Sequence, residues 1–107
     1  MAKGDFLGEF EQIVLLAVLR LDANAYGMEV RREINSRTGR DASIGAVYAT
    51  LDRLESKGLM RSREVAPAEG TGRPRKLYVV TAKGGQALAQ TREAVNRMWE
   101  GVKAPGV

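Results

Sequence analysis

The chain has 107 residues, a length that normally forms one domain, and 44% of them are hydrophobic, as in an ordinary folded protein. It has no cysteine and no histidine, which excludes disulfides, thiolate and imidazole catalysis, and the Cys or His ligands of metals. The net charge of +4 suits a polyanionic partner. The first residues, MAKGDFLGEFEQ, are acidic where a signal peptide is apolar, and no apolar run is long enough for a bilayer. We therefore expect a cytoplasmic protein with no cofactor, metal or membrane partner.

Two helices are predicted at the start of the chain. The first covers residues 8–21, and its second half is apolar almost all the way round, which indicates burial on more than one side. The second covers residues 26–38, with apolar residues at four-residue steps. It is expected to end at Gly39, because glycine readily takes the left-handed conformation that follows a helix.

A third helix, residues 43–57, is predicted to have two unlike faces, with Asp41 or Ser43 as its cap. Large apolar residues lie on one face at helical spacing: Ile44, Val47, Tyr48, Leu51 and Leu54. The other face mixes small, hydroxyl and cationic residues: Ser43, Ala46, Thr50, Arg53 and Lys57. A helix that is anchored on one side would thus present a flat, lightly basic surface on the other.

The outer face of this third helix suits the major groove of DNA, because small side chains let a helix axis come close to base edges. We expect contacts with bases or thymine methyl groups from a set of small residues near its start: Ser43, Gly45, Ala46, Ala49 and Thr50. Arg53 and Lys57 would then lie at the phosphates. The alternative is that the small residues are only surface or packing residues.

Two short strands, residues 59–65 and 76–80, are predicted after the third helix from alternating patterns. The segment APAEGTGRPR between them forms a hairpin tip, and residues 61–76 hold five basic residues against two acidic ones. Arg73, Arg75 and Lys76 flank a proline that fixes the backbone, so their side chains leave at defined angles toward phosphates or a narrow minor groove. Alone, such a tip is equally well interpreted as a solvated loop.

The last predicted helix is capped by Thr81 and runs to about Val102, with Leu88 and Val95 at seven-residue steps before it. The order of elements is that of a winged helix-turn-helix followed by an extra helix. We expect a mainly α protein with a two-stranded β-hairpin wing. Residues 1–81 would form the DNA-binding domain, and residues 82–107 a dimerisation helix and short tail.

Catalysis is not expected. Most acidic residues lie beside a basic one at helical spacing, as Glu29 beside Arg32, which is typical of solvated helix faces rather than of paired catalytic carboxylates. The glycines of GTGRPRK are not followed by the Gly-Lys-Ser/Thr of a phosphate-binding loop.

These residues carry a resemblance to the PadR family of transcriptional regulators. The matching segments are LGEFEQIVLLAVLRL, AYGMEVRREI, SIGAVYATLDRLESKGL and GRPRKLYVVTAKG, which together cover nearly all of residues 7–99. The last two, in that order and spacing, are specific. The resemblance implies a homodimeric bacterial repressor of the compact subgroup, with a winged helix-turn-helix and a short C-terminal dimerisation helix.

The resemblance also implies roles for single residues. Tyr48 stands where a family tyrosine reaches the DNA backbone, although spacing alone favours a core aromatic. The wing is residues 65–76. Two positions differ from the usual family pattern but keep an apolar side chain. Leu77 stands where a second tyrosine is frequent, and Val80 where leucine usually precedes the threonine.

The last helix is expected to form a dimer interface with residues from the start of the chain. The expected interface residues are Phe6, Phe10, Leu88, Val95, Met98, Trp99 and Val102. Trp99 has two interpretations: a packing anchor against the partner's first helix, or, by resemblance to some compact relatives, a wall of a pocket for a small planar apolar effector.

The sequence therefore predicts a homodimeric regulator that binds double-stranded DNA, most simply a repressor reading an inverted-repeat operator. The alternative is a winged-helix module that binds protein. Such a module would usually expose large apolar anchors, and the outward face of the third helix has none in the sequence.

Overall fold

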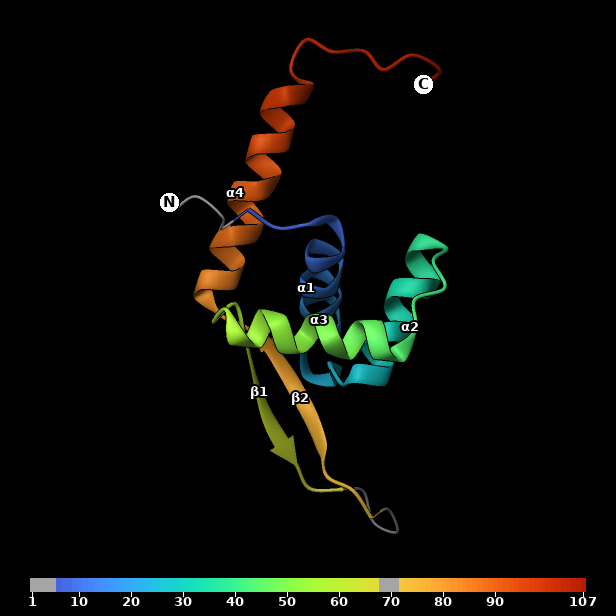
Figure 1. Ribbon diagram of the computed structural model, residues 1–107, viewed down its shortest axis with the longest axis vertical. Coiled ribbons are helices and arrows are strands. Elements are labelled where there is room, and N and C mark those ends of the chain that lie inside the picture. The colour runs from blue at the N-terminus through green and yellow to red at the C-terminus, as the bar shows by residue number, and fades with distance from the viewer. Residues whose placement is uncertain (1–5, 68–71) are drawn as a thin grey trace.

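The computed structural model describes residues 6–67 and 72–107, so the centre of the predicted hairpin tip, residues 68–71, lies outside the described part of the chain. The described elements are, in chain order, α1 (Glu9–Leu21), the short 3-10 helix η1 (Asp22–Asn24), α2 (Gly27–Thr38), α3 (Ile44–Ser56), β1 (Met60–Val65), β2 (Arg75–Val80) and α4 (Ala82–Trp99) (Figure 1). This is the predicted order, and the predicted fold, mainly α with a two-stranded hairpin, is confirmed. The end of α4 differs most, since this helix stops at Trp99 and not near residue 102.

Local signals determine where the helices begin and end. The Ser43 hydroxyl accepts a hydrogen bond from the N–H three residues later at 3.1 Å, so Ser43 and not Asp41 caps α3. Thr81 caps α4 in the same way at 3.0 Å. Helix α2 ends at Gly39, whose φ of +71° lies in the left-handed region, as predicted.

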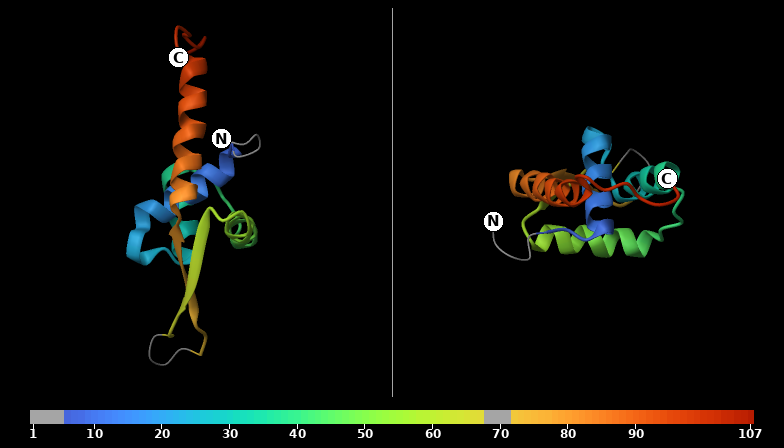
Figure 2. Two further views of the ribbon diagram at one scale, coloured as in Figure 1. Left: turned by 90° about the vertical axis from the view of Figure 1, so that its left-hand side faces the viewer. Right: turned by 90° about the horizontal axis from the view of Figure 1, so that it is seen from above.

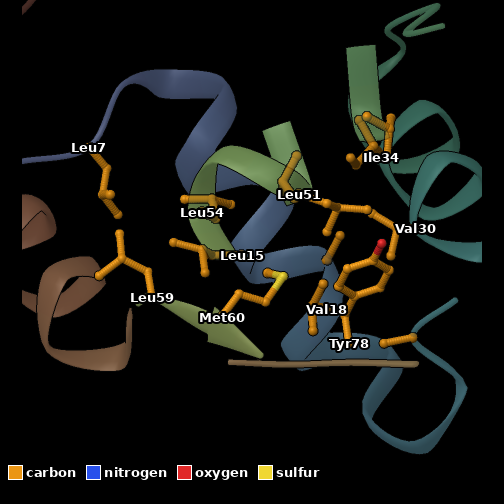
Figure 3. Close-up of a cluster of buried hydrophobic side chains, with 14 of the residues drawn as sticks. Leu7, Leu15, Val18, Val30, Ile34, Leu51, Leu54, Leu59, Met60 and Tyr78 are labelled. Carbon is orange, nitrogen blue, oxygen red and sulfur yellow. The ribbon is translucent and has the colours of Figure 1, made fainter. Parts of the chain in front are cut away.

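Helix α1 is the centre of the hydrophobic core. It contacts α2, α3, β2 and α4, and Figure 3 shows its Leu15 and Val18 among side chains from the other helices and the sheet. Fully buried partners are Val30 and Ile34 on α2, Val47, Leu51 and Leu54 on α3, and Met60 and Tyr78 on the strands. Because α3 buries one face against α1, its other face is fixed outward.

The two strands form an antiparallel hairpin whose register runs from Met60 opposite Val80 to Val65 opposite Arg75. Strand β2 is hydrogen-bonded to the segment that precedes α2. The Tyr78 N–H donates to the carbonyl oxygen just before α2, on Ala25, at 3.0 Å. The hairpin extends beyond the helices in the direction opposite to the projecting end of α4 (Figure 1).

Helix α4 has a packed half and a projecting half. In the packed half, Gly84, Ala87 and Thr91 are buried, and the Thr91 hydroxyl accepts the Leu7 N–H at 3.1 Å. After Thr91 the side chains are partly or fully exposed, and Figure 2 shows this half rising away from the other elements. None of the helices in the described ranges is long and apolar enough to cross a membrane.

The contact of α4 with the strands depends on the absence of a side chain at Gly84. A Cβ there would lie 2.1 Å from the carbonyl oxygen of Leu59 and 2.9 Å from Val80 Cγ1. We predict that Gly84→Ala lowers the free energy of unfolding by roughly 3 kcal/mol, the upper end of the usual cost of overpacking. Urea unfolding followed by circular dichroism measures this.

Gly45→Ala is the matched control, because Gly45 also lies in the first turn of a helix. A Cβ there would meet only the Ser43 hydroxyl oxygen, at 4.0 Å. This change should raise the free energy of unfolding by about 0.5–1 kcal/mol through the higher helix propensity of alanine. Equal effects of the two substitutions would show that the close approach at Gly84 is not a constraint.

Candidate nucleic-acid interface

The outward face of α3 carries most of the small residues predicted for it. Ser43, Gly45, Ala46 and Ala49 are exposed, whereas Val47, Leu51 and Leu54 on the same helix are buried. Figure 2 (right) shows α3 along one face of the molecule, with α1 directly behind it. A rigid helix with a shallow, small-residue surface is therefore presented on one side of the molecule.

Two positions on α3 differ from the prediction. Thr50 was expected on the outward face, but only 3% of it is exposed. It belongs to the buried stripe that repeats at helical spacing from Val47 to Leu54, and its hydroxyl oxygen is 3.4 Å from an Arg53 guanidinium nitrogen that donates to it. The prediction that Thr50 lies on the outward face of α3 is therefore wrong.

Tyr48 also lies differently from what the spacing alone favoured. It is 40% exposed and so is not a core aromatic. Its ring lies over the start of α2 at Gly27, where a Cβ would be only 2.4 Å from the ring and the hydroxyl. The glycine makes room for the ring, so the tyrosine links α2 to α3 while part of its side chain stays exposed.

Arg53 on α3 and Lys57 just after this helix are both hydrogen-bonded to one carboxylate of α1. Glu11 Oε2 accepts hydrogen bonds from Arg53 Nε at 3.3 Å and from Lys57 Nζ at 2.9 Å. Glu11 Oε1 accepts the Gly8 N–H at 3.0 Å, which also caps α1. The Glu11 side chain is only 11% exposed, whereas those of Arg53 and Lys57 are about half exposed. No pattern within the first helix sets Glu11 apart from the other acidic residues.

The environment of Glu11 favours its charged form. Burial by itself raises the pKa of the carboxyl group, but the hydrogen bonds from Lys57, the Gly8 N–H and Arg53, together with the charge of Lys57, outweigh burial and hold the pKa below its ordinary value. Glu11 is therefore a fixed negative charge directly beside two residues predicted to face phosphate.

The described part of the wing carries the predicted cations on its surface. Arg73, Arg75 and Lys76 are exposed, on both sides of Pro74. The Arg75 guanidinium lies 3.9 Å from the centre of the Tyr26 ring, a distance at which a cation and an aromatic face attract each other. Tyr26 immediately precedes α2, whereas the predicted helix began at this residue. It is partly buried and supports the base of the wing.

These features together define a winged helix-turn-helix whose third helix and hairpin both present cations and small side chains outward. The sequence profile of the family described as "Transcriptional regulator PadR-like family" matches residues 15–90. The chain belongs to this family, which consists of transcriptional regulators rather than enzymes.

Individual relatives agree with this assignment. Transcriptional regulator Rv3488 of Mycobacterium tuberculosis is 35% identical over 77 residues, which cover 72% of this chain and 68% of that protein. The structure of a PadR family transcription regulator from Clostridium difficile R20291 is similar with a TM-score of 0.63 and 26% identity, over 82% of this chain and 94% of that one. That of a PadR family transcriptional regulator from Eggerthella lenta has a TM-score of 0.67 and 25% identity, over 87% and 81%.

The contact between Tyr26 and Arg75 can be measured by a double-mutant cycle. We predict that Tyr26→Leu and Arg75→Met, alone and combined, give a coupling free energy of about 0.5–1 kcal/mol, the usual range for an exposed cation–aromatic pair. Urea unfolding of the four proteins provides the value. Tyr26→Phe should retain most of the coupling because the ring remains. A coupling of zero would mean that Tyr26 does not orient the Arg75 side chain.

Proposed function

We propose that this chain is a cytoplasmic, homodimeric repressor that binds DNA sequence-specifically. The observation that carries the proposal is the exposed small-residue face of α3, formed by Ser43, Gly45, Ala46 and Ala49 and backed by a fully packed core. Each subunit would place this face in the major groove of one half-site. Membership of a family of transcriptional regulators supports this assignment.

The cations supply the part of binding that does not depend on sequence. Arg53 and Lys57 would reach the phosphates beside the major groove, and Arg73, Arg75 and Lys76 the flanking phosphates or minor groove. Tyr48, which is 40% exposed, would contact the DNA backbone. Affinity should then depend strongly on salt, while the face of α3 discriminates between sequences.

The apolar surface that one chain leaves exposed supports a homodimer. In the projecting half of α4 and just after it, Val95, Met98, Trp99 and Val102 are all roughly half exposed or more. A groove of about 700 Å³ lies between α1 and α4, with Leu16, Leu19 and Leu88 in its lining. We propose that α4 of a second copy packs into this groove, which would cover these residues.

The start of the chain contributes to the same proposed interface. Phe6 is exposed and precedes Leu7, which is hydrogen-bonded to α4. Phe10 is partly buried, and its ring centre lies 5.9 Å from the guanidinium carbon of Arg40, which follows α2. In the proposed dimer, a twofold axis would relate the two copies. Their α3 helices would then read an inverted repeat with half-sites about one helical turn apart.

Trp99 carries the regulatory part of the proposal. It is the chain's one tryptophan, and 54% of it is exposed. We propose that it packs in the dimer and that a small planar apolar effector can bind against it, changing the angle between the two reading helices. Its fluorescence should respond to at least some members of a library of flat aromatic compounds. If the fluorescence responds to no compound in the library, the effector proposal is wrong, whereas the DNA-binding proposal is unaffected.

The DNA-binding proposal is tested by fluorescence anisotropy with a labelled duplex from upstream of the protein's own gene, against a scrambled duplex. The wild-type protein should prefer the native duplex, and affinity should fall steeply between about 50 and 200 mM salt. Arg75→Ala should weaken binding to both duplexes by a similar factor and reduce the slope of log affinity against log salt by about 0.9.

Arg37→Ala is the control for this experiment, since Arg37 is also an exposed cation but pairs with Glu33 within α2. It should change the salt slope much less than Arg75→Ala. Equal, weak binding of the wild-type protein to both duplexes, and to further candidate operators, would contradict the proposal. It would favour the alternative, a winged-helix module whose partner is a protein.

A further inference from the structure

We propose that Glu11 is a positioning residue that acts as an internal counter-ion for Arg53 and Lys57, and that it limits the affinity of this protein for the DNA backbone. This inference rests on the proposed function. Glu11 lies on α1 and is not itself on the outward face of α3, so its influence is exerted through the two cations that it holds.

Glu11 accepts hydrogen bonds from both side chains and so fixes the position of their charged groups. One carboxylate oxygen, Oε2, accepts from Arg53 Nε at 3.3 Å and from Lys57 Nζ at 2.9 Å, and the other is held by the Gly8 N–H. The carboxylate is thus fixed by the backbone of α1, whereas the cations extend over it from α3 and remain about half exposed. The outer sides of both cations are free to face a phosphate while their inner sides face Glu11.

This arrangement has two opposing consequences for DNA binding. The carboxylate orders two long side chains, which lowers the entropy lost when they meet phosphate. It also places a negative charge behind them, which repels the same phosphates and cancels part of their charge. We infer that the charge effect is the larger one, because the contact of Arg53 with Thr50 limits that side chain even without the carboxylate.

The experiment compares Glu11→Gln with wild type by fluorescence anisotropy on the native and scrambled duplexes. Glutamine keeps the shape and can still accept the Gly8 N–H, but it removes the negative charge. We expect about tenfold tighter binding near 50 mM salt, falling to about threefold near 200 mM, because one more positive charge steepens the salt slope by about 0.9. The factor should be similar for both duplexes, since phosphate contacts carry no sequence information.

Glu33→Gln is the matched control. Glu33 also accepts from two cations, Arg20 Nε at 3.1 Å and Arg37 Nε at 2.7 Å, and its substitution changes the net charge by the same amount. Its partners lie on α1 and α2 and not on α3, so the salt slope should change much less than with Glu11→Gln. Circular dichroism and gel filtration of both variants at neutral pH verify that each is folded.

A second variant links the effect to the cation. In an Arg53→Ala background, Glu11→Gln should give a smaller gain than in the wild-type background, because one of its two partners is absent. Weaker DNA binding by Glu11→Gln, or a change of slope no larger than that of Glu33→Gln, would overturn the inference. A wild-type protein that shows no operator preference would instead overturn the proposed function, so the two failures are distinguishable.

Discussion

The packing of α3 against α1 is the constraint on which the rest of this structure depends. One face of α3 is buried, through Val47, Leu51 and Leu54, and the helix contacts α2 and β1 as well as α1. The opposite face is therefore fixed in direction and needs no large side chain for stability. Burial on this scale contributes roughly 2 kcal/mol for each large apolar side chain, so the small outward residues cost the fold little. The candidate reading surface is available because the core is built entirely on the other side.

The same central helix links the candidate DNA-binding face to the proposed dimer interface. At its start, α1 holds the cations of α3 through Glu11, and the segment just before it is bonded to α4 by the Leu7 N–H and the Thr91 hydroxyl. Its exposed Leu16 and Leu19 line the groove beside α4. A second subunit docked in that groove would therefore touch the helix that also supports α3. This continuity provides a physical route by which dimer geometry can set the position of the reading helices.

The order and type of the elements were predictable because they depend on local patterns: apolar spacing, caps and glycine ends. The placement of single side chains at the site was not. Thr50 points inward because it lies within the buried stripe of α3, and Tyr48 packs over Gly27 because this glycine, on another helix, leaves room for its ring. Glu11 meets Arg53 across 42 positions of sequence. Such contacts depend on how helices pack, which spacing within one helix does not contain.

The central claim, that the exposed face of α3 reads DNA, is tested most directly by an NMR titration. The isotope-labelled protein would be followed through its amide resonances as the native duplex is added. We expect the largest changes at Gly45, Ala46 and Ala49, and near Arg75 in the wing, with much smaller changes along the groove between α1 and α4. Changes confined to that groove, or none on α3 at a concentration where the duplex is bound, would contradict the claim.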